Sequence, residues 1–392
     1  MESSIVMDNK PRILIVHPIS NKNYTGGQRI HLQITKEIPK FANLITLDSS
    51  ILCPPQGTIW NRSLGRYSYV KLLAKHIEEL HPDLVFIDLY WFRSYGLSLL
   101  NLPKKIPILS YIQTPEALIS GNKIEQSFAP WFYVSNPIKL YWYRLLFSLL
   151  LIRSNKILTL GPWLKNFLES TIPFYHYLGL SDKIVITGSG IGISSPILPV
   201  SKVSKNVADL ADIHVMGVGY VDPYKGVHTL ISALAELPKE LCPQVDWYGQ
   251  TSHNPSYYQF CIELSFKLGV SDRVKFYDWI SPELMPQIWQ NHDVFVSTAP
   301  LEGYGLVFQE ALSYGLFILA PITGSGQFFI KDQINGILYE DKNPKALAHA
   351  LQSTPFYVTQ ISPSERYEKT LNLREYHASL SSPSQVIFNH LT

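Results

Sequence analysis

Short apolar runs rich in β-branched residues recur along this chain, separated by stretches with helical periodicity or by turn residues. In the first half, such runs predict strands at residues 12–17, 81–88, 107–112, 156–160 and 183–187. In the second half, they predict strands at residues 213–219, 244–248, 273–277, 293–297 and 316–320. Strands that alternate with helices form a parallel sheet whose two faces are covered by those helices. The pattern therefore predicts an α/β protein.

A break in this alternation divides the chain near residue 190. The segment from Gly188 to Pro196 is rich in glycine and serine and is predicted to be a linker. A chain of 392 residues is long enough for two wound units. The tail up to Leu391 has one or two helices, with a restart at Ser382-Pro383. The domains are therefore expected at residues 1–190 and 191–355, followed by C-terminal helices at residues 356–392.

Cysteine and histidine usage argues against a disulfide framework and a metal site. Cys53, Cys242 and Cys261 form no CxxC pair, and the twelve histidines include no HExxH motif. The chain also lacks Asp-X-Asp, the acidic motif that a divalent metal with a diphosphate would favour. The N-terminus lacks the basic-then-apolar order of a signal peptide. A reducing cytosol is therefore the expected compartment, with no metal bound.

Charge is distributed unevenly along the chain. Residues 1–190 hold 20 Lys and Arg against 12 Asp and Glu, whereas the remaining residues hold 13 and 19. The basic first half suggests an acidic partner such as anionic lipid or an anionic saccharide, although ordinary surface variation explains it equally well. Residues 140–152 are apolar and aromatic but too short to span a bilayer, which needs about 20 residues. A buried helix is favoured there, and a helix lying at a membrane interface is the alternative.

The stretch from Ala299 to Leu312 carries the clearest chemical signal. Glu302 falls in a loop at the carboxyl end of a predicted strand, and Glu310 falls early in the following helix. Ligands bind at that edge of α/β sheets, glycines permit close approach, and a helix start favours an anion. Carboxylates that accept hydroxyl groups beside such an anion site suggest a sugar nucleotide. A glycine-rich turn with an acid at the helix start also occurs without any ligand.

A series of short motifs surrounds this stretch. Between Arg273 and Tyr339 they are Ser281-Pro-Glu283, Asp293-Val-Phe-Val, Glu302-Gly-Tyr-Gly-Leu, Glu310-Ala-Leu and Gly336-Ile-Leu-Tyr339. Earlier in the chain they are Gly26-Gly27, Gly190-Ile-Gly192, Gly217-Val-Gly219 and Lys225-Gly226. In this order the motifs resemble the family 4 glycosyltransferases of the GT-B fold, a glycogen-synthase-like group also called group 1, and the resemblance is strongest between Arg273 and Tyr339. The resemblance implies two Rossmann-like, doubly wound domains facing a cleft. The first would bind the acceptor and the second the nucleotide sugar, with the C-terminal helices crossing back to the first.

The resemblance also implies roles for individual residues. Glu302 would contact hydroxyls of the donor sugar, Glu310 would bind the ribose, and Lys225 would stabilise the departing diphosphate. The catalytic residues expected in this way are Glu302, Lys225 and Gln113. The expected donor- and nucleotide-binding residues are Gly26, Gly27, Gly219, Tyr220, Lys225, Tyr277, Trp279, Glu302, Gly303, Tyr304, Gly305, Leu306, Val307 and Glu310. For Gly26 and Gly27 a plain turn is the competing interpretation, and for Lys225 a solvated loop lysine.

The activity implied by the resemblance is retaining, metal-independent transfer of a hexose from a nucleoside-diphosphate sugar, most simply UDP-glucose or a similar UDP-hexose. The acceptor would be a saccharide or a lipid-linked saccharide in polysaccharide or glycoconjugate synthesis. The sugar nucleotide is a co-substrate, so no further cofactor is expected, and neither is a nucleic-acid partner. The expected location is cytoplasmic, with peripheral association at the inner membrane face through the basic N-terminal domain.

Two positions depart from the family pattern. Tyr220 stands where members often carry arginine, so the diphosphate would lose one cationic partner unless Arg29 compensates from the other domain. Gln113 stands where many members place histidine, and glutamine can hydrogen-bond the donor sugar but cannot shuttle protons. Glu116 is the nearest carboxylate, although a helix-start acid is the simpler interpretation. The alternative function is therefore a catalytically impaired nucleotide-sugar-binding protein of the same fold.

Overall fold

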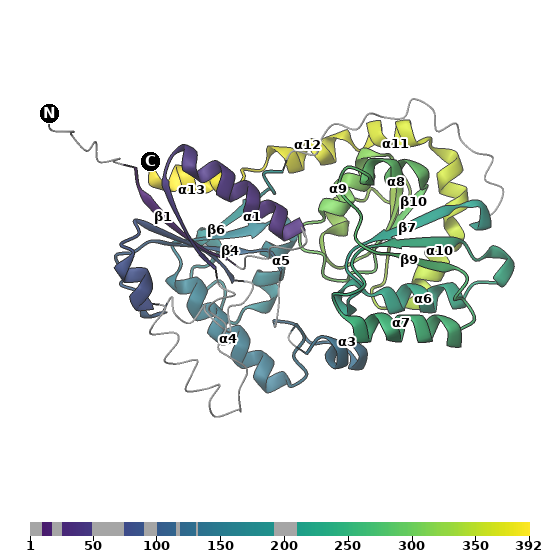
Figure 1. Cartoon of the computed structure of the whole chain (residues 1–392), viewed down its shortest axis with the longest axis horizontal. Helices are drawn as coiled ribbons and strands as arrows, with labels where there is room; N and C mark the ends of the chain where they lie inside the picture. Colours follow the sequence, from purple (N-terminus) through teal and green to yellow (C-terminus); the bar gives the residue numbers. More distant parts are fainter. Residues whose placement is uncertain are drawn as a thin grey trace. The chain divides into compact units, whose positions relative to one another are not determined.

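The computed structural model describes residues 10–17, 26–48, 74–89, 100–114, 118–130, 132–191 and 210–392. The expected linker after Ile191 and the carboxylate of Glu116 lie outside these residues. The chain forms two compact units. The first comprises residues 1–118, 137–191 and 379–392, and the second comprises residues 119–136 and 192–378. Each unit is built around one six-stranded parallel sheet (Figure 1).

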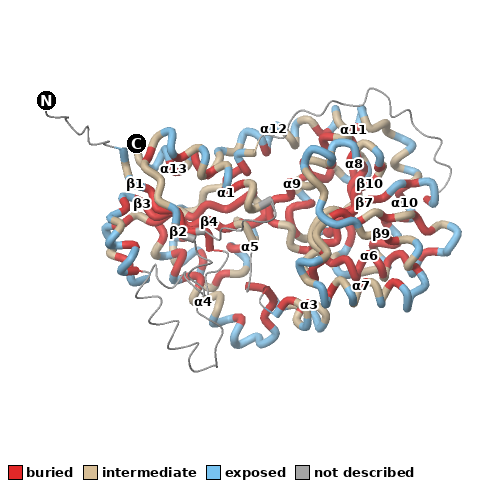
Figure 2. The backbone as a smooth tube through the Cα atoms, in the orientation of Figure 1, coloured by how far each residue is buried: buried red, intermediate tan, exposed pale blue. Residues whose placement is uncertain are grey.

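The first sheet has the strand order β2-β1-β3-β4-β5-β6. Its strands are β1 (Arg12–His17), β2 (Asn43–Asp48), β3 (Leu84–Asp88), β4 (Ile108–Ile112), β5 (Lys156–Leu160) and β6 (Ile184–Thr187). Its helices in the described residues include α1 (Gly26–Glu37), α4 (Pro137–Arg153), α5 (Pro162–Thr171) and α13 (Pro383–Leu391). Every residue of β3 and β4 is buried, as expected for central strands covered on both faces (Figure 2).

The second sheet has the order β12-β11-β10-β7-β8-β9. Its strands are β7 (His214–Val218), β8 (Gln244–Tyr248), β9 (Val274–Tyr277), β10 (Val294–Val296), β11 (Phe317–Pro321) and β12 (Gly336–Tyr339). Its α-helices in the described residues are α3 (Lys123–Phe128), α6 (Val227–Ala235), α7 (Pro255–Lys267), α8 (Met285–Asn291), α9 (Leu306–Ser313), α10 (Pro344–Gln360), α11 (Pro363–Lys369) and α12 (Leu371–Ser379).

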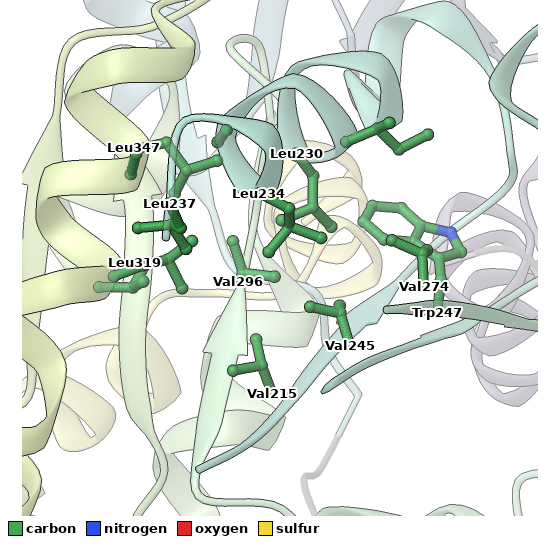
Figure 3. Packing of buried hydrophobic residues seen from close by; sticks show 14 of the residues in the cluster. Val215, Leu230, Leu234, Leu237, Val245, Trp247, Val274, Val296, Leu319 and Leu347 are labelled. Atoms are coloured by element: carbon green, nitrogen blue, oxygen red, sulfur yellow. The ribbon is translucent and has the colours of Figure 1, made fainter. Parts of the chain in front are cut away.

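Two hydrophobic clusters lie on opposite faces of this second sheet. One joins strand residues such as Val215 and Val245 to Leu230, Leu234 and other side chains of α6, α7 and α10 (Figure 3). The other joins alternate strand residues to side chains of α8 and α9. Because successive strand residues point to opposite faces, one apolar strand supplies both clusters. The doubly wound α/β fold predicted from the sequence is thus confirmed.

Two strands were not predicted from the sequence. They are β2 and β12, and each pairs with only one neighbour at the edge of its sheet. Leu44, Ile45, Ile337 and Leu338 are only partly buried, whereas β3, β4, β10 and β11 are buried along their whole length. An edge strand needs a less continuous apolar run, so its sequence signal is weaker.

Residues 119–136 were expected in the N-terminal domain but belong to the second unit. Asn254 donates a hydrogen bond of 2.9 Å to the carbonyl of Phe128, and the Lys342 ammonium lies 2.9 Å from the Glu125 carboxylate. The Phe128 ring also contacts the ring of Tyr257 at a centroid distance of 5.6 Å. These partners come from distant parts of the sequence, so local pattern does not predict them.

The C-terminal helices are also divided differently from the expected boundary at residue 356. The chain up to Ala378 belongs to the second unit, and only residues 379–392 return to the first. The predicted restart is confirmed, since α13 begins at Pro383 with the Ser382 hydroxyl accepting the Gln385 amide. Within the first unit, the Phe388 ring of α13 lies 5.2 Å from that of Phe41.

The apolar segment at residues 140–152 forms most of α4 and is only half buried. Leu140, Phe147, Leu150 and Leu151 point into the first unit. Ile138, Tyr141, Trp142, Leu149 and Ile152 are exposed along another face of the same helix. The buried-helix prediction therefore describes one face of α4 alone. Among the described residues, no helix is both long and apolar enough to cross a bilayer.

Candidate functional site

The principal site residues gather at the carboxyl ends of β7 and β10. These strands pair in parallel although they are not consecutive, so the direction of winding reverses between them. Loops that leave such a switch point in opposite directions leave room for a ligand outside the sheet. The loop after β7 leads into a short 3-10 helix, η6 (Pro223–Lys225), and the loop after β10 leads into α9.

Gly226 and Thr298 hold the η6 loop against the end of β10. The Thr298 hydroxyl donates a hydrogen bond of 2.6 Å to the carbonyl of Lys225. Gly226 has a φ of +69°, and a Cβ placed there would lie 2.3 Å from the Thr298 carbonyl oxygen. Both the backbone angle and the contact require glycine at this position. The Lys225-Gly226 pair singled out in the sequence is therefore a constrained turn rather than a freely solvated loop.

Lys225 and Glu302 meet in this site. The Lys225 ammonium donates a hydrogen bond of 2.6 Å to a carboxylate oxygen of Glu302. Each side chain is only 18% exposed. The Lys225 stem passes over Gly219, where an added Cβ would lie 3.1 Å from Cε of the lysine. Three of the residues predicted from separate motifs are thus brought together.

The turn before α9 is built around Gly305. This residue has a φ of +80° and is the N-cap of the helix, and an added Cβ would lie 2.4 Å from the Phe308 ring. Gly303, Tyr304 and Leu306 are buried beside it. The backbone amides of Leu306 and Val307, which open α9, therefore follow Glu302 by only a few residues, and amides at a helix start favour an anionic ligand.

Glu310 lies farther along α9 and is partly buried. Burial and, after it, the charge of Glu310 raise the pKa of the Tyr314 hydroxyl. The carbonyl of Glu302 accepts a hydrogen bond of 2.8 Å from the Ser325 amide, so a second glycine-rich turn supports the first. The structure thus places the two glutamates on a loop and a helix as predicted, and Val307 lies between them in the first turn of α9.

Tyr220 stacks on a histidine that the sequence reasoning missed. The rings of Tyr220 and His253 are 4.3 Å apart and inclined by 7°. The His253 Nε2 atom lies 3.7 Å from the carboxylate of Asp222, which is itself 1% exposed. Burial raises the pKa of Asp222 to about 6, although hydrogen bonds from Asn254 and from the Tyr224 amide act to lower this pKa. The Asp222-Pro223 pair is a recognisable helix-start signal, whereas nothing local to His253 indicates this contact.

Tyr277 and Trp279 lie at and just beyond the carboxyl end of β9. The Tyr277 ring stacks on that of Tyr248 at 4.8 Å and is 37% exposed, while Trp279 is 43% exposed. Both rings therefore offer an accessible aromatic surface, which suits a planar ligand. No described contact links either ring to Lys225 or Glu302.

Gln113 belongs to a separate polar cluster in the first unit, together with His31 and Asp88. Its amide Nε2 donates a hydrogen bond of 2.7 Å to Asp88 Oδ2, and His31 Nε2 lies 2.6 Å from the same oxygen. Gln113 Nε2 also lies 2.8 Å from His31 Nε2, so the three side chains meet at one point. Gln113 Oε1 then points toward α1, where an added Cβ at Gly27 would lie 2.5 Å from it.

This cluster lies at the switch point of the first sheet, since α1 follows β1, Asp88 ends β3 and Gln113 follows β4. His31 and Asp88 are 5% and 2% exposed. Sequence reasoning singled out Gly27 and Gln113 but missed the other two, although Asp88 ends a predicted strand and His31 follows Gly26-Gly27 on the same helix. Arg29 is also on α1 and is partly buried.

The second unit matches a known protein family. A family model described as "Glycosyl transferases group 1" matches residues 202–354. The chain is 31% identical over 139 residues to the D-inositol 3-phosphate glycosyltransferase of Corynebacterium diphtheriae. These aligned residues make up 34% of this chain and 32% of that protein. The chain is 24% identical over 161 residues to an uncharacterized glycosyltransferase of Methanocaldococcus jannaschii, covering 40% of each. The chain thus spans about a third of the length of the first of these curated relatives.

Solved structures extend the likeness to nearly the whole chain. A sucrose-phosphate synthase from Thermosynechococcus elongatus has a TM-score of 0.66 at 16% identity, covering 97% of this chain and 98% of that one. HepE from Anabaena in complex with UDP and glucose has a TM-score of 0.61 at 16% identity, covering 94% and 98%. WaaG, a glycosyltransferase involved in lipopolysaccharide biosynthesis, has a TM-score of 0.57 at 16% identity, covering 95% and 97%. The two units therefore have the GT-B fold of these proteins, and residues 202–354 are similar in sequence to the group 1 glycosyl transferases.

Proposed function

We propose that this chain is a retaining glycosyltransferase that transfers a hexose from a UDP-sugar to a saccharide or lipid-linked saccharide acceptor. The observation that carries the proposal is the Lys225–Glu302 pair, held at the switch point of the second sheet beside the start of α9. A cation and a carboxylate that can accept hydroxyl groups are thus in contact, a few residues before the helix start. The match of residues 202–354 to group 1 glycosyl transferases supports the same assignment.

In the proposed reaction the bond between the anomeric carbon and the diphosphate oxygen breaks, and a bond from that carbon to an acceptor oxygen forms on the same face. Lys225 and the amides of the first turn of α9 stabilise the negative charge that grows on the diphosphate. The acceptor hydroxyl gives its proton to the departing phosphate oxygen. Glu302 holds hydroxyls of the sugar, and Glu310 holds the ribose.

The proposal is tested by incubating the full chain with UDP- and GDP-sugars and a panel of saccharide acceptors in EDTA. We expect nucleotide release that depends on the donor and persists in EDTA, because Lys225 and the helix start supply the positive charge. Proton NMR of the product should show the anomeric configuration of the donor. An absence of turnover with every donor would refute the proposal.

The departures at Tyr220 and Gln113 favour a second candidate, a nucleotide-sugar-binding protein without catalysis. Neither side chain brings the positive charge or the imidazole found there in related enzymes. Calorimetry of UDP binding, combined with an assay of UDP release from a UDP-sugar, separates the two candidates. A binding protein would bind UDP yet would never release it from a UDP-sugar, even slowly to water, whereas a transferase would release it with or without an acceptor.

The exposed face of α4 supports a peripheral membrane position for the first unit. Ile138 and Trp142 are 69% and 61% exposed on this helix. No acidic residue occurs between residues 126 and 168, a stretch that carries five Lys and Arg. Arg153 at the end of α4 donates hydrogen bonds to the carbonyls of Pro103 and Ile106, which flank the exposed pair Lys104 and Lys105. An apolar stripe beside cations without acids suits an anionic bilayer surface.

Vesicle sedimentation tests this part of the proposal. We expect the chain to sediment with vesicles of phosphatidylcholine and phosphatidylglycerol and to bind pure phosphatidylcholine less. The double variant Ile138→Ser, Trp142→Ser should lose this binding, whereas Phe266→Ser, which removes an exposed aromatic ring from α7, should keep it. Equal sedimentation of both variants would show that α4 is not the membrane face. Self-association that the double variant abolishes would assign this face to a second copy of the chain.

A further inference from the structure

Lys225 and Glu302 are bonded to each other, although the proposed function assigns them to different parts of one ligand. The hydrogen bond of 2.6 Å between the ammonium and the carboxylate joins residues 77 positions apart in the sequence. With both side chains only 18% exposed, water compensates either charge poorly once the pair is broken. A ligand that takes Lys225 must therefore also satisfy Glu302.

Other groups of the loop have partners of their own. Asp222, the carboxylate at the start of η6, accepts hydrogen bonds from the Asn254 amide and the Tyr224 backbone amide. The Lys225 backbone is fixed at both ends, since its amide donates to the Asp222 carbonyl and its carbonyl accepts from Thr298. The Lys225 stem also lies over Gly219. The ammonium can turn away from Glu302 only as far as this anchored stem allows.

Two ligands would affect the pair differently. Free UDP can engage Lys225 through its diphosphate, but it leaves the Glu302 carboxylate without a cation and close to added negative charge. A UDP-sugar engages Lys225 in the same way, and its sugar hydroxyls donate hydrogen bonds to Glu302. Only the sugar nucleotide therefore gives a new partner both to Lys225, through its diphosphate, and to Glu302, through its sugar hydroxyls.

We infer that Glu302 is a specificity-determining residue, which competes with the diphosphate for Lys225 and so makes the site favour a sugar nucleotide over the free nucleotide. The inference rests on the proposed function and deepens it. After transfer, the UDP product no longer carries the donor sugar whose hydroxyls Glu302 held, so the carboxylate returns to Lys225. The same pair then promotes release of the product.

Calorimetric titration with UDP and with UDP-glucose tests this inference on the full chain. We expect Glu302→Gln to bind UDP about tenfold more tightly than the unchanged protein, because Lys225 is then free of its ionic partner. The same variant should bind UDP-glucose more weakly relative to UDP, so the ratio of the two affinities reverses. Lys225→Gln should weaken both ligands.

The double variant Lys225→Gln, Glu302→Gln distinguishes a specific pair from a general charge effect. In the Lys225→Gln background, replacing Glu302 should tighten UDP binding much less than it does in the unchanged protein. Glu240→Gln on the surface of the same unit changes the net charge equally and should leave both affinities unchanged. Glu302→Ser provides a second carboxylate-free variant if the glutamine form unfolds.

The outcomes separate the inference from the proposed function. A chain that binds neither UDP nor UDP-glucose would contradict the function itself. A chain that binds UDP-glucose, but whose Glu302 variants bind UDP no more tightly, would overturn the inference alone. Tightening of equal size in the Lys225→Gln background would also overturn it, because the effect would then not pass through Lys225.

Discussion

Single residues without side chains shape the site at closest range. Gly226 and Gly269 have φ angles of +69° and +70°, so both are strained by any other residue. Their surroundings differ, since an added Cβ would meet the Thr298 carbonyl oxygen at 2.3 Å in the first case and nothing within 4 Å in the second. Substitutions at these two glycines therefore separate the cost of backbone strain from the cost of steric contact.

We expect Gly269→Ala to lower the free energy of unfolding by about 1 kcal/mol through strain alone. Gly226→Ala should cost about 1–3 kcal/mol more, because the η6 loop must also move away from β10. Urea unfolding of both variants measures the difference. Equal losses would show that the contact with Thr298 does not constrain the loop.

Residue motifs close together in the sequence were predictable, and pairs far apart were not. Glu302, Gly305 and Glu310 belong to one strand–turn–helix segment, so their relative placement follows from local structure. His31 and Asp88 are 57 positions apart and meet only because β1 and β3 are neighbours in the sheet. No local signal in the sequence reports such a neighbour.

At the scale of elements, the start of η6 carries a titratable group. Burial raises the pKa of Asp222 from 3.8 to about 6. Between these values the folded protein holds a proton that the unfolded chain has released. The contribution of Asp222 to stability is therefore highest below pH 3.8 and is lost as the pH rises toward 6.

Asp222→Asn removes this dependence while keeping an acceptor for the Tyr224 amide. We expect the unfolding free energy of the variant, relative to the unchanged protein, to rise by about 1–3 kcal/mol between pH 4 and pH 7. Urea unfolding at both pH values measures it. Repeating the comparison with His253→Gln present removes the nearby imidazole as a cause, and a difference independent of pH would contradict the prediction.

Local sequence signals predicted where a helix begins better than they predicted which strands exist or which face of a helix is buried. Ser382 and Pro383 mark the start of α13 in the sequence and in the structure. The edge strands β2 and β12 were missed because their partly buried residues give only a weak apolar run. The division of α4 into a buried and an exposed face depends on the neighbours that pack against it.

At the scale of the whole molecule, residues 119–136 leave the first unit and join the second. Glu125 is 2% exposed and is held by the Lys342 ammonium and by the Asn122 amide. This segment therefore depends on contacts with residues more than a hundred positions away.

We expect Lys342→Met to destabilise this attachment by about 1–3 kcal/mol, because it leaves a largely buried carboxylate without its cation. Hydrogen exchange followed by mass spectrometry should show faster exchange for α3 and unchanged exchange for β1 to β6. Lys345→Met, an exposed position on α10, is the matched control and should leave α3 protected. Unchanged exchange of α3 in Lys342→Met would mean that the pair does not hold the segment.

The sequence alone determined the α/β class, the two wound units and the strand–turn–helix segment of Glu302 and Glu310, because periodicity and turn chemistry act over a few residues. The tertiary structure alone decided that Lys225 pairs with Glu302, that Asp88 receives His31 and Gln113, and that α3 belongs to the second unit. These contacts follow from the order of strands in each sheet. That order minimises the free energy of the whole packed unit, so no short stretch of sequence contains it.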